Sequence, residues 1–98
     1  MGHHFRQEIL MRLKPNLIHL NVGKDHFVVD PDGGAINLTD LYAMNEAAAD
    51  LWEHFGNRDF TPEDMAGQLA ASYDVSPEQA LTDVRQLLET WNKYGLIL

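Results

Sequence analysis

The chain has 98 residues, 45% of them hydrophobic and 22% charged, a composition that suits one small globular domain and excludes a disordered chain. It contains no Cys, which excludes disulfides and Cys-based zinc sites, and its apolar runs are too short to span a membrane. The formal net charge of −8 argues against electrostatic attraction to nucleic acid.

We expect residues 1–98 to form a single domain, of which residues 1–10 are disordered or come in part from an expression tag. The start of the sequence has no basic segment followed by a long apolar stretch, so it does not read as a secretory signal. A small chain without Cys is expected in the cytoplasm.

The charge is distributed unevenly along the chain. Residues 1–49 carry four basic and six acidic side chains, whereas residues 50–98 carry three basic and nine acidic ones. The C-terminal half would therefore repel phosphate groups. A protein partner with a basic or mixed-charge binding segment fits this balance better.

The first apolar pattern is typical of β-structure. In residues 17–22, Ile18, Leu20 and Val22 alternate with polar residues, which predicts a strand with these three on one side. A turn at residues 23–25 leads to a returning strand over residues 26–30, which is rich in β-formers. After a second break, a third strand is expected within residues 36–44, completing a small antiparallel meander.

Three helices follow, each marked by its first residues. Asn45 is a capping residue that predicts a helix over residues 46–55, and Gly56 is expected to end it in a left-handed conformation. Residues 61–64 and 76–79 each combine a capping hydroxyl with Pro at the first helical position, which predicts two further helix starts.

The two later helices carry apolar faces of helical period. In the second, the stripe expected to be buried is Met65, Leu69 and Tyr73. The third is expected to run to about Tyr94 and to stop at Gly95. Its apolar face recurs every three or four residues, at Ala80, Leu81, Val84, Leu87, Leu88 and Trp91. The sequence therefore predicts an α+β domain, a winged-helix-like three-stranded antiparallel sheet followed by three helices.

Catalytic and metal-binding patterns are weak. His19 and His26 flank the first turn, but two imidazoles do not close a zinc site and the spacing places no third ligand. No segment matches a calcium loop, a phosphate-binding loop or a nucleophile elbow. We expect no catalytic residue, no metal and no cofactor, and therefore a protein that is not an enzyme.

A DNA-binding regulator is the alternative that the helix lengths suggest. A recognition helix needs phosphate-pairing residues near its N-terminal half. Residues 76–83 contain Glu78 and Asp83 but no basic residue, and Arg85 is the first cation of this helix. A winged-helix DNA-binding regulator is therefore the second hypothesis, and a protein-binding module without affinity for nucleic acid or membrane is the first.

The third strand and the third helix offer a binding surface. The third strand ends the meander, so one of its edges is expected to be free for strand addition by a peptide. The apolar face of the third helix is wider than a small sheet needs to cover. An alternative is that the first helix packs against this face, and the spacing does not decide between the two.

Several landmarks of the chain resemble the PqqD-like family, whose members carry a "Leu-Asn-x-x-Ala-x-x-Ile/Leu-Trp" run where a strand meets a helix. In this sequence the run lies in residues 43–52, with Met44 in the leucine place. The resemblance covers about residues 11–98. Its other landmarks, each short and apolar, are Phe27-Val28-Val29, Gly56, Thr61, Leu69, Tyr73, Asp83-Val84, Leu87-Leu88 and Gly95-Leu96-Ile97.

The resemblance implies a non-catalytic peptide chaperone, or recognition element, for a ribosomally synthesised precursor peptide. Members of the family bind the leader of the precursor as an added strand and present it to a modifying enzyme, often a radical SAM protein. The namesake serves pyrroloquinoline quinone (PQQ) biosynthesis, and relatives serve other peptides. Two exposed third strands could also pair with each other, which would make a homodimer and hide the peptide site.

The resemblance also implies where the leader peptide binds. The strand side of the groove would be formed by residues of the third strand, and the helix side by a face of the third helix one step from the core stripe. The strand residues are Asp40, Leu41, Tyr42 and Ala43, and the helix residues are Leu81, Arg85, Leu88 and Asn92. Arg85 would pair with an acidic residue of the leader.

Overall fold

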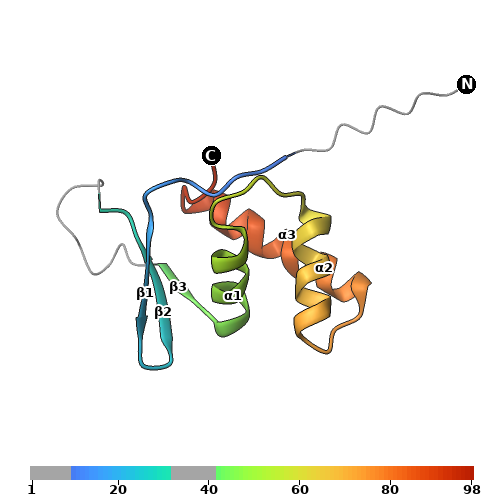
Figure 1. Ribbon diagram of the computed structural model, residues 1–98. Helices are drawn as coiled ribbons and strands as arrows, with labels where there is room; N and C mark the ends of the chain where they lie inside the picture. The colour runs from blue at the N-terminus through green and yellow to red at the C-terminus, as the bar shows by residue number, and fades with distance from the viewer. Residues whose placement is uncertain (1–9, 32–41) are drawn as a thin grey trace, which may run out of the picture.

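The computed structural model describes residues 10–31 and 42–98, and Figure 1 shows a small sheet on one side of three helices. The elements follow in the order β1 (Ile18–Val22), β2 (Asp25–Val29), β3 (Tyr42–Met44), α1 (Glu46–Phe55), α2 (Pro62–Ser72) and α3 (Pro77–Lys93). This confirms the predicted α+β class and the order of its elements. The predictions for residues 1–9 and 32–41 lie outside the described residues.

The sheet is antiparallel with the strand order β1-β2-β3. Gly23 and Lys24 join β1 to β2, and Gly23 has a φ of 64°, which fits the first central position of a type II′ turn. The returning strand begins one residue earlier than predicted, at Asp25. Of the range expected for the third strand, the described part is Tyr42–Met44.

The two faces of the sheet are unequally covered. His19, Val28 and Tyr42 share the face toward the helices, because His19 pairs with Val28 and Val28 with Tyr42. Leu20 pairs with Phe27 and lies on the opposite, outer face. The apolar side of β1 is therefore the one that faces away from the helices, and its three side chains Ile18, Leu20 and Val22 are exposed.

The three helices begin where the sequence predicts. The side chain of Asn45 accepts a hydrogen bond from the N–H of Ala48 at the start of α1 (2.8 Å). Thr61 and Asp64 form a reciprocal capping box at the start of α2. The side chain of Ser76 accepts from the N–H of Gln79 at the start of α3. These caps satisfy backbone donors that would otherwise lack a partner.

The sequence predicted that α1 ends at Gly56 in a left-handed conformation and that α3 stops at Gly95, and the second of these two predictions is confirmed. Gly95 follows α3 with a φ of 73°, as expected for a glycine that stops a helix. The expectation for Gly56 was wrong, because its φ of −58° and ψ of −27° are right-handed. The chain leaves α1 through a right-handed turn that the N–H of Arg58 closes on the Phe55 carbonyl. A Cβ at Gly56 would lie 3.1 Å from the Trp52 carbonyl oxygen, so close packing is what limits the side chain here.

One hydrophobic core joins the sheet to the helices. The rings of Trp52 on α1 and Trp91 on α3 meet edge to face at 5.2 Å, and Phe55 packs on Phe60. The N-terminal segment completes this core, since Leu13 is 1% exposed and bridges to Ile97, while Met11 bridges to Phe60. Within the described residues, no helix is both long enough and apolar enough to cross a membrane.

Candidate functional site

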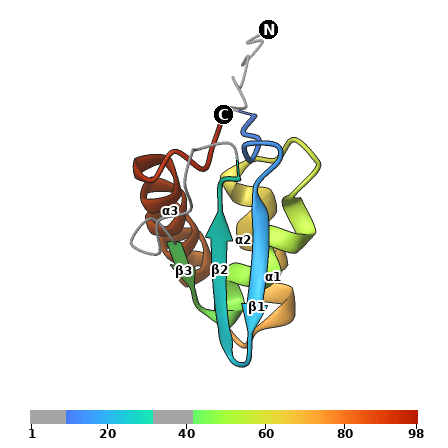
Figure 2. The same cartoon turned by 90° about the vertical axis from the view of Figure 1, so that its left-hand side faces the viewer.

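The first part of the candidate site is the outer edge of β3. Within the described residues β3 pairs with β2 alone, so its other edge is open, and Figure 2 shows that edge on the side of α3. In an antiparallel hairpin, the two residues that flank a two-residue turn form a hydrogen-bonded pair. Hydrogen-bonded and non-hydrogen-bonded pairs then alternate along the two strands. Counting from Val22 and Asp25 makes Val28–Tyr42 and His26–Met44 the hydrogen-bonded pairs of the second ladder.

This alternation identifies the backbone groups that are available at the open edge. Tyr42 and Met44 direct their N–H and C=O groups to β2, so Ala43 directs its own outward. Ala43 is exposed, whereas Met44 is 7% exposed and belongs to the core. An extended peptide laid along this edge would therefore pair with Ala43.

The second part of the candidate site is the face of α3 that carries Leu81, Arg85, Leu88 and Asn92. Spacings of three and four place these residues on one side of the helix. Leu81 is half-buried, and Arg85 and Asn92 are exposed. Arg85 makes no ion pair with any described carboxylate, so its charge is available to an incoming group. Leu88 is only 4% exposed, which makes it part of the core beneath this face.

An aromatic contact joins the two parts. The ring of Tyr42 on β3 packs on Tyr94, the residue that caps α3, with ring centroids 4.7 Å apart. Burial raises the pKa of the Tyr42 hydroxyl above its ordinary value of 10.0, and Trp91 partly offsets this effect. The indole N–H of Trp91 is buried without a well-formed hydrogen bond in the described part of the chain. Tyr94 is 60% exposed and was not predicted as a site residue.

Two of the predicted site residues, Asp40 and Leu41, lie outside the described residues. The structure brings Tyr42 against Tyr94, just beyond the C-terminal end of α3. Asn92 lies two residues before Tyr94, and Arg85 and Leu81 lie about two and three turns closer to the helix start than Asn92. The signal for Tyr94 was present in the sequence, as an aromatic residue immediately before the glycine that stops the helix.

His19 and His26 lie away from the candidate site, on the side of the β1–β2 hairpin that faces α1. Nε2 of His19 and Nδ1 of His26 are 2.9 Å apart, and Nδ1 of His19 bonds the Glu53 carboxylate on α1. The three side chains form a hydrogen-bonded chain that ties the hairpin to α1. Within residues 10–31 and 42–98, no cluster of three or more His, Cys, Asp or Glu side chains could hold a metal ion.

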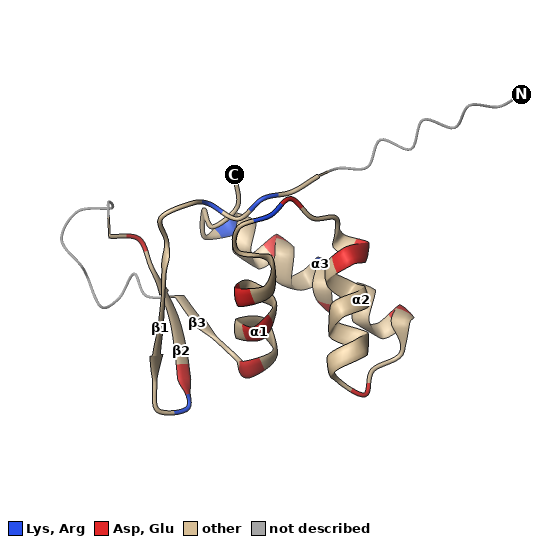
Figure 3. Cartoon of the chain, viewed as in Figure 1, with Lys and Arg blue, Asp and Glu red and all other residues tan. Residues whose placement is uncertain are grey.

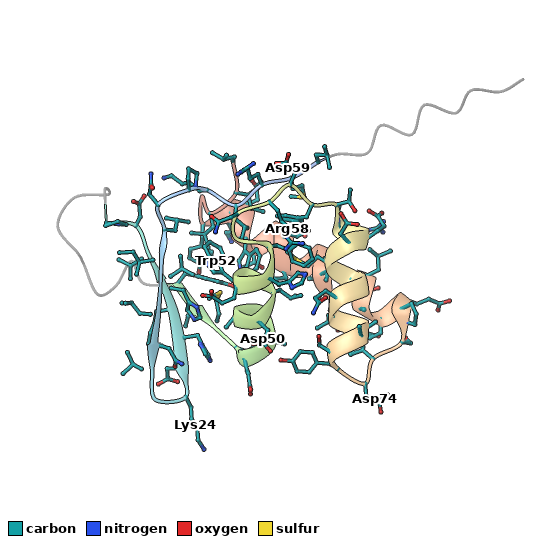
Figure 4. All side chains as sticks on the ribbon, viewed as in Figure 1. Lys24, Asp50, Trp52, Arg58, Asp59 and Asp74 are labelled. Atoms are coloured by element: carbon teal, nitrogen blue, oxygen red, sulfur yellow. The ribbon has the colours of Figure 1, made fainter. Side chains whose placement is uncertain are left out.

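A cavity of about 400 Å³ lies on the other side of α3, between α1 and the α2–α3 pair. Its lining includes Leu51, Leu69, Val84, Leu87 and Asp83. None of the predicted site residues lines this cavity, and no sequence pattern predicted it. Near its rim the Tyr73 hydroxyl donates to the Asp50 carboxylate, which Figure 4 places on α1.

Acidic groups dominate the surface of the helical half. Figure 3 shows red segments on all three helices, and the described cations of this half are Arg58, Arg85 and Lys93. Arg85 is thus the cation of α3 that lies on the candidate face. The arrangement suits a ligand that offers backbone groups, apolar side chains and an acidic residue, and it opposes a nucleic acid.

The fold, the open strand edge and the acidic helices together define a winged-helix-like binding domain. The sequence model of the family described as "Coenzyme PQQ synthesis protein D (PqqD)" matches residues 25–97. The chain therefore belongs to this family. No curated protein sequence matches the chain.

Two solved structures share this fold. One is "TbiB1 in Complex with the TbiA(beta) Leader Peptide", with a TM-score of 0.67 and 16% identity, covering 89% of this chain and 94% of that chain. The other is "Lasso peptide synthetase B1 complexed with the leader peptide", with a TM-score of 0.68 and 22% identity, covering 90% of this chain and 96% of that chain. Both superpose over nearly the whole domain, which confirms the winged-helix-like architecture.

Proposed function

We propose that this protein is a non-catalytic recognition element that binds the leader of a ribosomally synthesised precursor peptide and presents the peptide to a modifying enzyme. Family membership supports this role, and both structural neighbours are complexes with leader peptides. The observation that carries the proposal is the open edge of β3 beside α3, where the outward backbone groups of Ala43 offer a pairing site.

The proposed binding mode is strand addition. The leader adds to β3 beyond Ala43, and alternate side chains of the leader turn toward α3. Leu81 supplies an apolar contact, Arg85 a charge for an acidic residue, and Asn92 an amide near the C-terminal end of the helix. Leu88 supports this face from beneath. Asp40 and Leu41 extend the strand side of the proposed groove.

The proposed partners follow from this role. The modifying enzyme is a separate protein, of the radical SAM class in the proposal, and the pathway is PQQ or a related peptide product. The action is placed in the cytoplasm, where ribosomal precursors are made. Pairing of strand edges between two copies would give a homodimer.

Binding to DNA has no comparable support. The N-terminal half of α3, which would enter the major groove, carries Glu78 and Asp83 and no cation before Arg85. Neither the family match nor the two structural neighbours is a DNA-binding protein by its description.

The test is a titration of isotope-labelled protein with a synthetic leader from a precursor encoded beside the gene, followed by amide chemical shifts. We expect shifts confined to β3 and to one face of α3, with Ala43 among the largest. Shifts that map instead to α1, α2 and the cavity between them would overturn the groove. A duplex DNA of mixed sequence serves as the second ligand, and it is expected to cause no shifts at 150 mM salt.

A further inference from the structure

The opposite edge of the sheet lies on β1, and no other strand within residues 10–31 and 42–98 protects it. Soluble proteins usually guard an edge strand with Lys, Pro, a bulge or a covering segment. β1 reads Ile-His-Leu-Asn-Val and contains no Lys, Arg, Asp, Glu, Pro or Gly. Within the described residues it pairs with β2 alone. Figure 2 shows β1 at the far side of the sheet from β3 and α3.

The side chains of β1 make this edge apolar. Ile18, Leu20 and Val22 are 45%, 41% and 63% exposed and form a continuous row on the outer face. Isolated exposed apolar residues are ordinary, but a contiguous row marks a contact surface. Charged residues lie at the hairpin end of this row: Lys24 at the tip, where Figure 4 shows it, and Asp25 on β2, opposite Val22.

The backbone groups at this edge are those of His19 and Asn21. The turn makes Val22–Asp25 a hydrogen-bonded pair, so Leu20 and Ile18 also direct their backbone groups to β2. His19 and Asn21 then direct theirs outward. The ring of His19 is turned inward and held by Glu53 and His26, so its backbone is fixed in an extended conformation at the edge.

The order of apolar and polar side chains in β1 is the same when it is read from either end: apolar, polar, apolar, polar, apolar. This symmetry favours a second copy of the chain as the partner that pairs with the β1 edge. An antiparallel copy centred on Leu20 places Leu20 beside Leu20 of the other chain and Ile18 beside Val22. His19 then faces Asn21, and these are the two residues with outward backbone groups, as an antiparallel hydrogen-bonded pair requires. No like charges meet across this two-fold axis.

We propose that β1 pairs antiparallel with β1 of a second copy, so that two three-stranded sheets join into one six-stranded sheet. The two β3 edges then lie at the outer ends of this sheet and stay open. A homodimer formed this way is compatible with two bound leaders, whereas pairing through β3 would occupy the leader edge. The inference rests on β1 alone and does not depend on leader binding.

A strand of five residues gives a small interface, so the dimer is expected to be weak, with a Kd of about 100 µM. The two copies each carry a net charge of −8 and repel one another. Because salt screens this repulsion, raising the salt concentration is expected to strengthen the dimer. The test is sedimentation velocity on the full chain without peptide, from 10 µM to 1 mM protein, at low and at high salt.

Two variants separate β1 pairing from other contacts. Leu20→Lys places like charges side by side at the two-fold axis and is expected to weaken the dimer at least tenfold. Leu98→Lys makes the same change at another exposed leucine and is expected to leave the dimer unchanged. Asn21→Pro removes an outward donor without touching the β1–β2 ladder, and it is expected to act like Leu20→Lys.

The outcomes decide the proposal. A chain that stays monomeric at 1 mM and high salt overturns it. A dimer that survives both Leu20→Lys and Asn21→Pro also overturns it, because the contact would then lie elsewhere. Neither result bears on the leader groove, which the chemical-shift titration tests separately.

Discussion

The ring of Tyr42 packs against the ring of Tyr94 with centroids 4.7 Å apart, and this contact fixes β3 relative to the C-terminal end of α3. Tyr42 is half-buried beside the core, whereas Tyr94 is exposed. The pair closes one end of the proposed groove. The contact helps to position the open edge of β3 beside the exposed face of α3 before a peptide binds, and such pre-organisation lowers the entropic cost of binding.

Ala43→Pro tests strand addition directly. Proline removes the outward N–H of Ala43 and leaves the Tyr42 and Met44 hydrogen bonds to β2 in place. We expect the leader Kd to rise about tenfold, which corresponds to the loss of roughly one hydrogen bond at about 1.4 kcal/mol. Isothermal titration calorimetry measures the change. Ala43→Val keeps the donor and should bind as the native chain does, so weakened binding in the valine variant would point to a steric effect.

Leu81→Ala tests the helix side of the groove. Leu81 and Leu87 are both half-buried leucines of α3 but lie on opposite margins of its core stripe. Truncation of either should lower the free energy of unfolding by about 1 to 2 kcal/mol. Only Leu81→Ala should also weaken leader binding, by about tenfold, as measured by fluorescence anisotropy of a labelled leader. Equal losses of affinity in both variants would remove Leu81 from the site.

Arg85→Glu tests the charge on the same face. An acidic leader should bind about tenfold more weakly, because an attractive charge becomes a repulsive one next to the peptide. Lys93→Glu makes the same change in net charge on the same helix, away from this face, and should alter the Kd less than twofold at 150 mM salt. Both variants change the net charge of the helix by the same amount, so similar effects would mean that net charge, and not contact with Arg85, controls affinity.

Asn45→Ala tests the junction between β3 and α1. Its side chain caps α1, and the alanine variant should lose about 1 kcal/mol of stability in urea denaturation. Asn45→Asp retains the acceptor oxygen and should be close to the native stability. If both variants have the same midpoint of urea denaturation as the native protein, the cap makes no measurable contribution to stability.

The stability of the protein should fall at alkaline pH through Tyr73. A hydrogen bond to Asp50 raises the pKa of Tyr73 to about 12 in the folded protein, above the ordinary tyrosine value of 10.0. A raised pKa stabilises the folded state fully below pH 10, and this contribution is lost as the pH rises from 10 to about 12. The measurement is the Tm between pH 9 and 12.

Tyr73→Phe provides the matching comparison. This variant should lose part of the alkaline dependence and should lack the highest tyrosinate transition in absorbance at 295 nm. Tyr94→Phe, which leaves the Tyr73–Asp50 bond intact, should retain both. An unchanged pH profile in Tyr73→Phe would assign the alkaline loss to other groups, of which Tyr42 is the first candidate because burial raises its pKa.

The sequence was most informative where one residue controls local geometry. Asn45, Thr61 and Ser76 were predicted as caps and are confirmed, because a side-chain oxygen at a helix start has few other uses. The alternating row on β1 predicted a strand correctly but did not say which face is covered. A period of two assigns side chains to faces, and only the packing of α1 on the sheet decides which face is inside.

The candidate site was harder to predict than the fold. Leu81 and Leu88 differ by seven positions and were assigned the same role, yet Leu88 is buried and Leu81 lies at the margin of the core. A helical period of 3.6 rotates residues seven apart by about 20°, which is enough to move one of them from the margin of a face into the core. For this reason a charge at Leu88 would test the fold, and Leu81 is the better probe of binding.

The segment that runs from Met11 to Lys14 has a consequence for how the domain assembles. It lies between the loop that carries Phe60 and the last residues of the chain, with hydrogen bonds from Lys14 to Leu96 and from Leu98 to Arg12. These contacts close a loop that includes nearly the whole polypeptide, so they carry a large entropic cost and should form late in folding. The helices and the hairpin can assemble first through local contacts. Residues 11–14 and residues 96–98 then form their hydrogen bonds with each other after most of the core has formed.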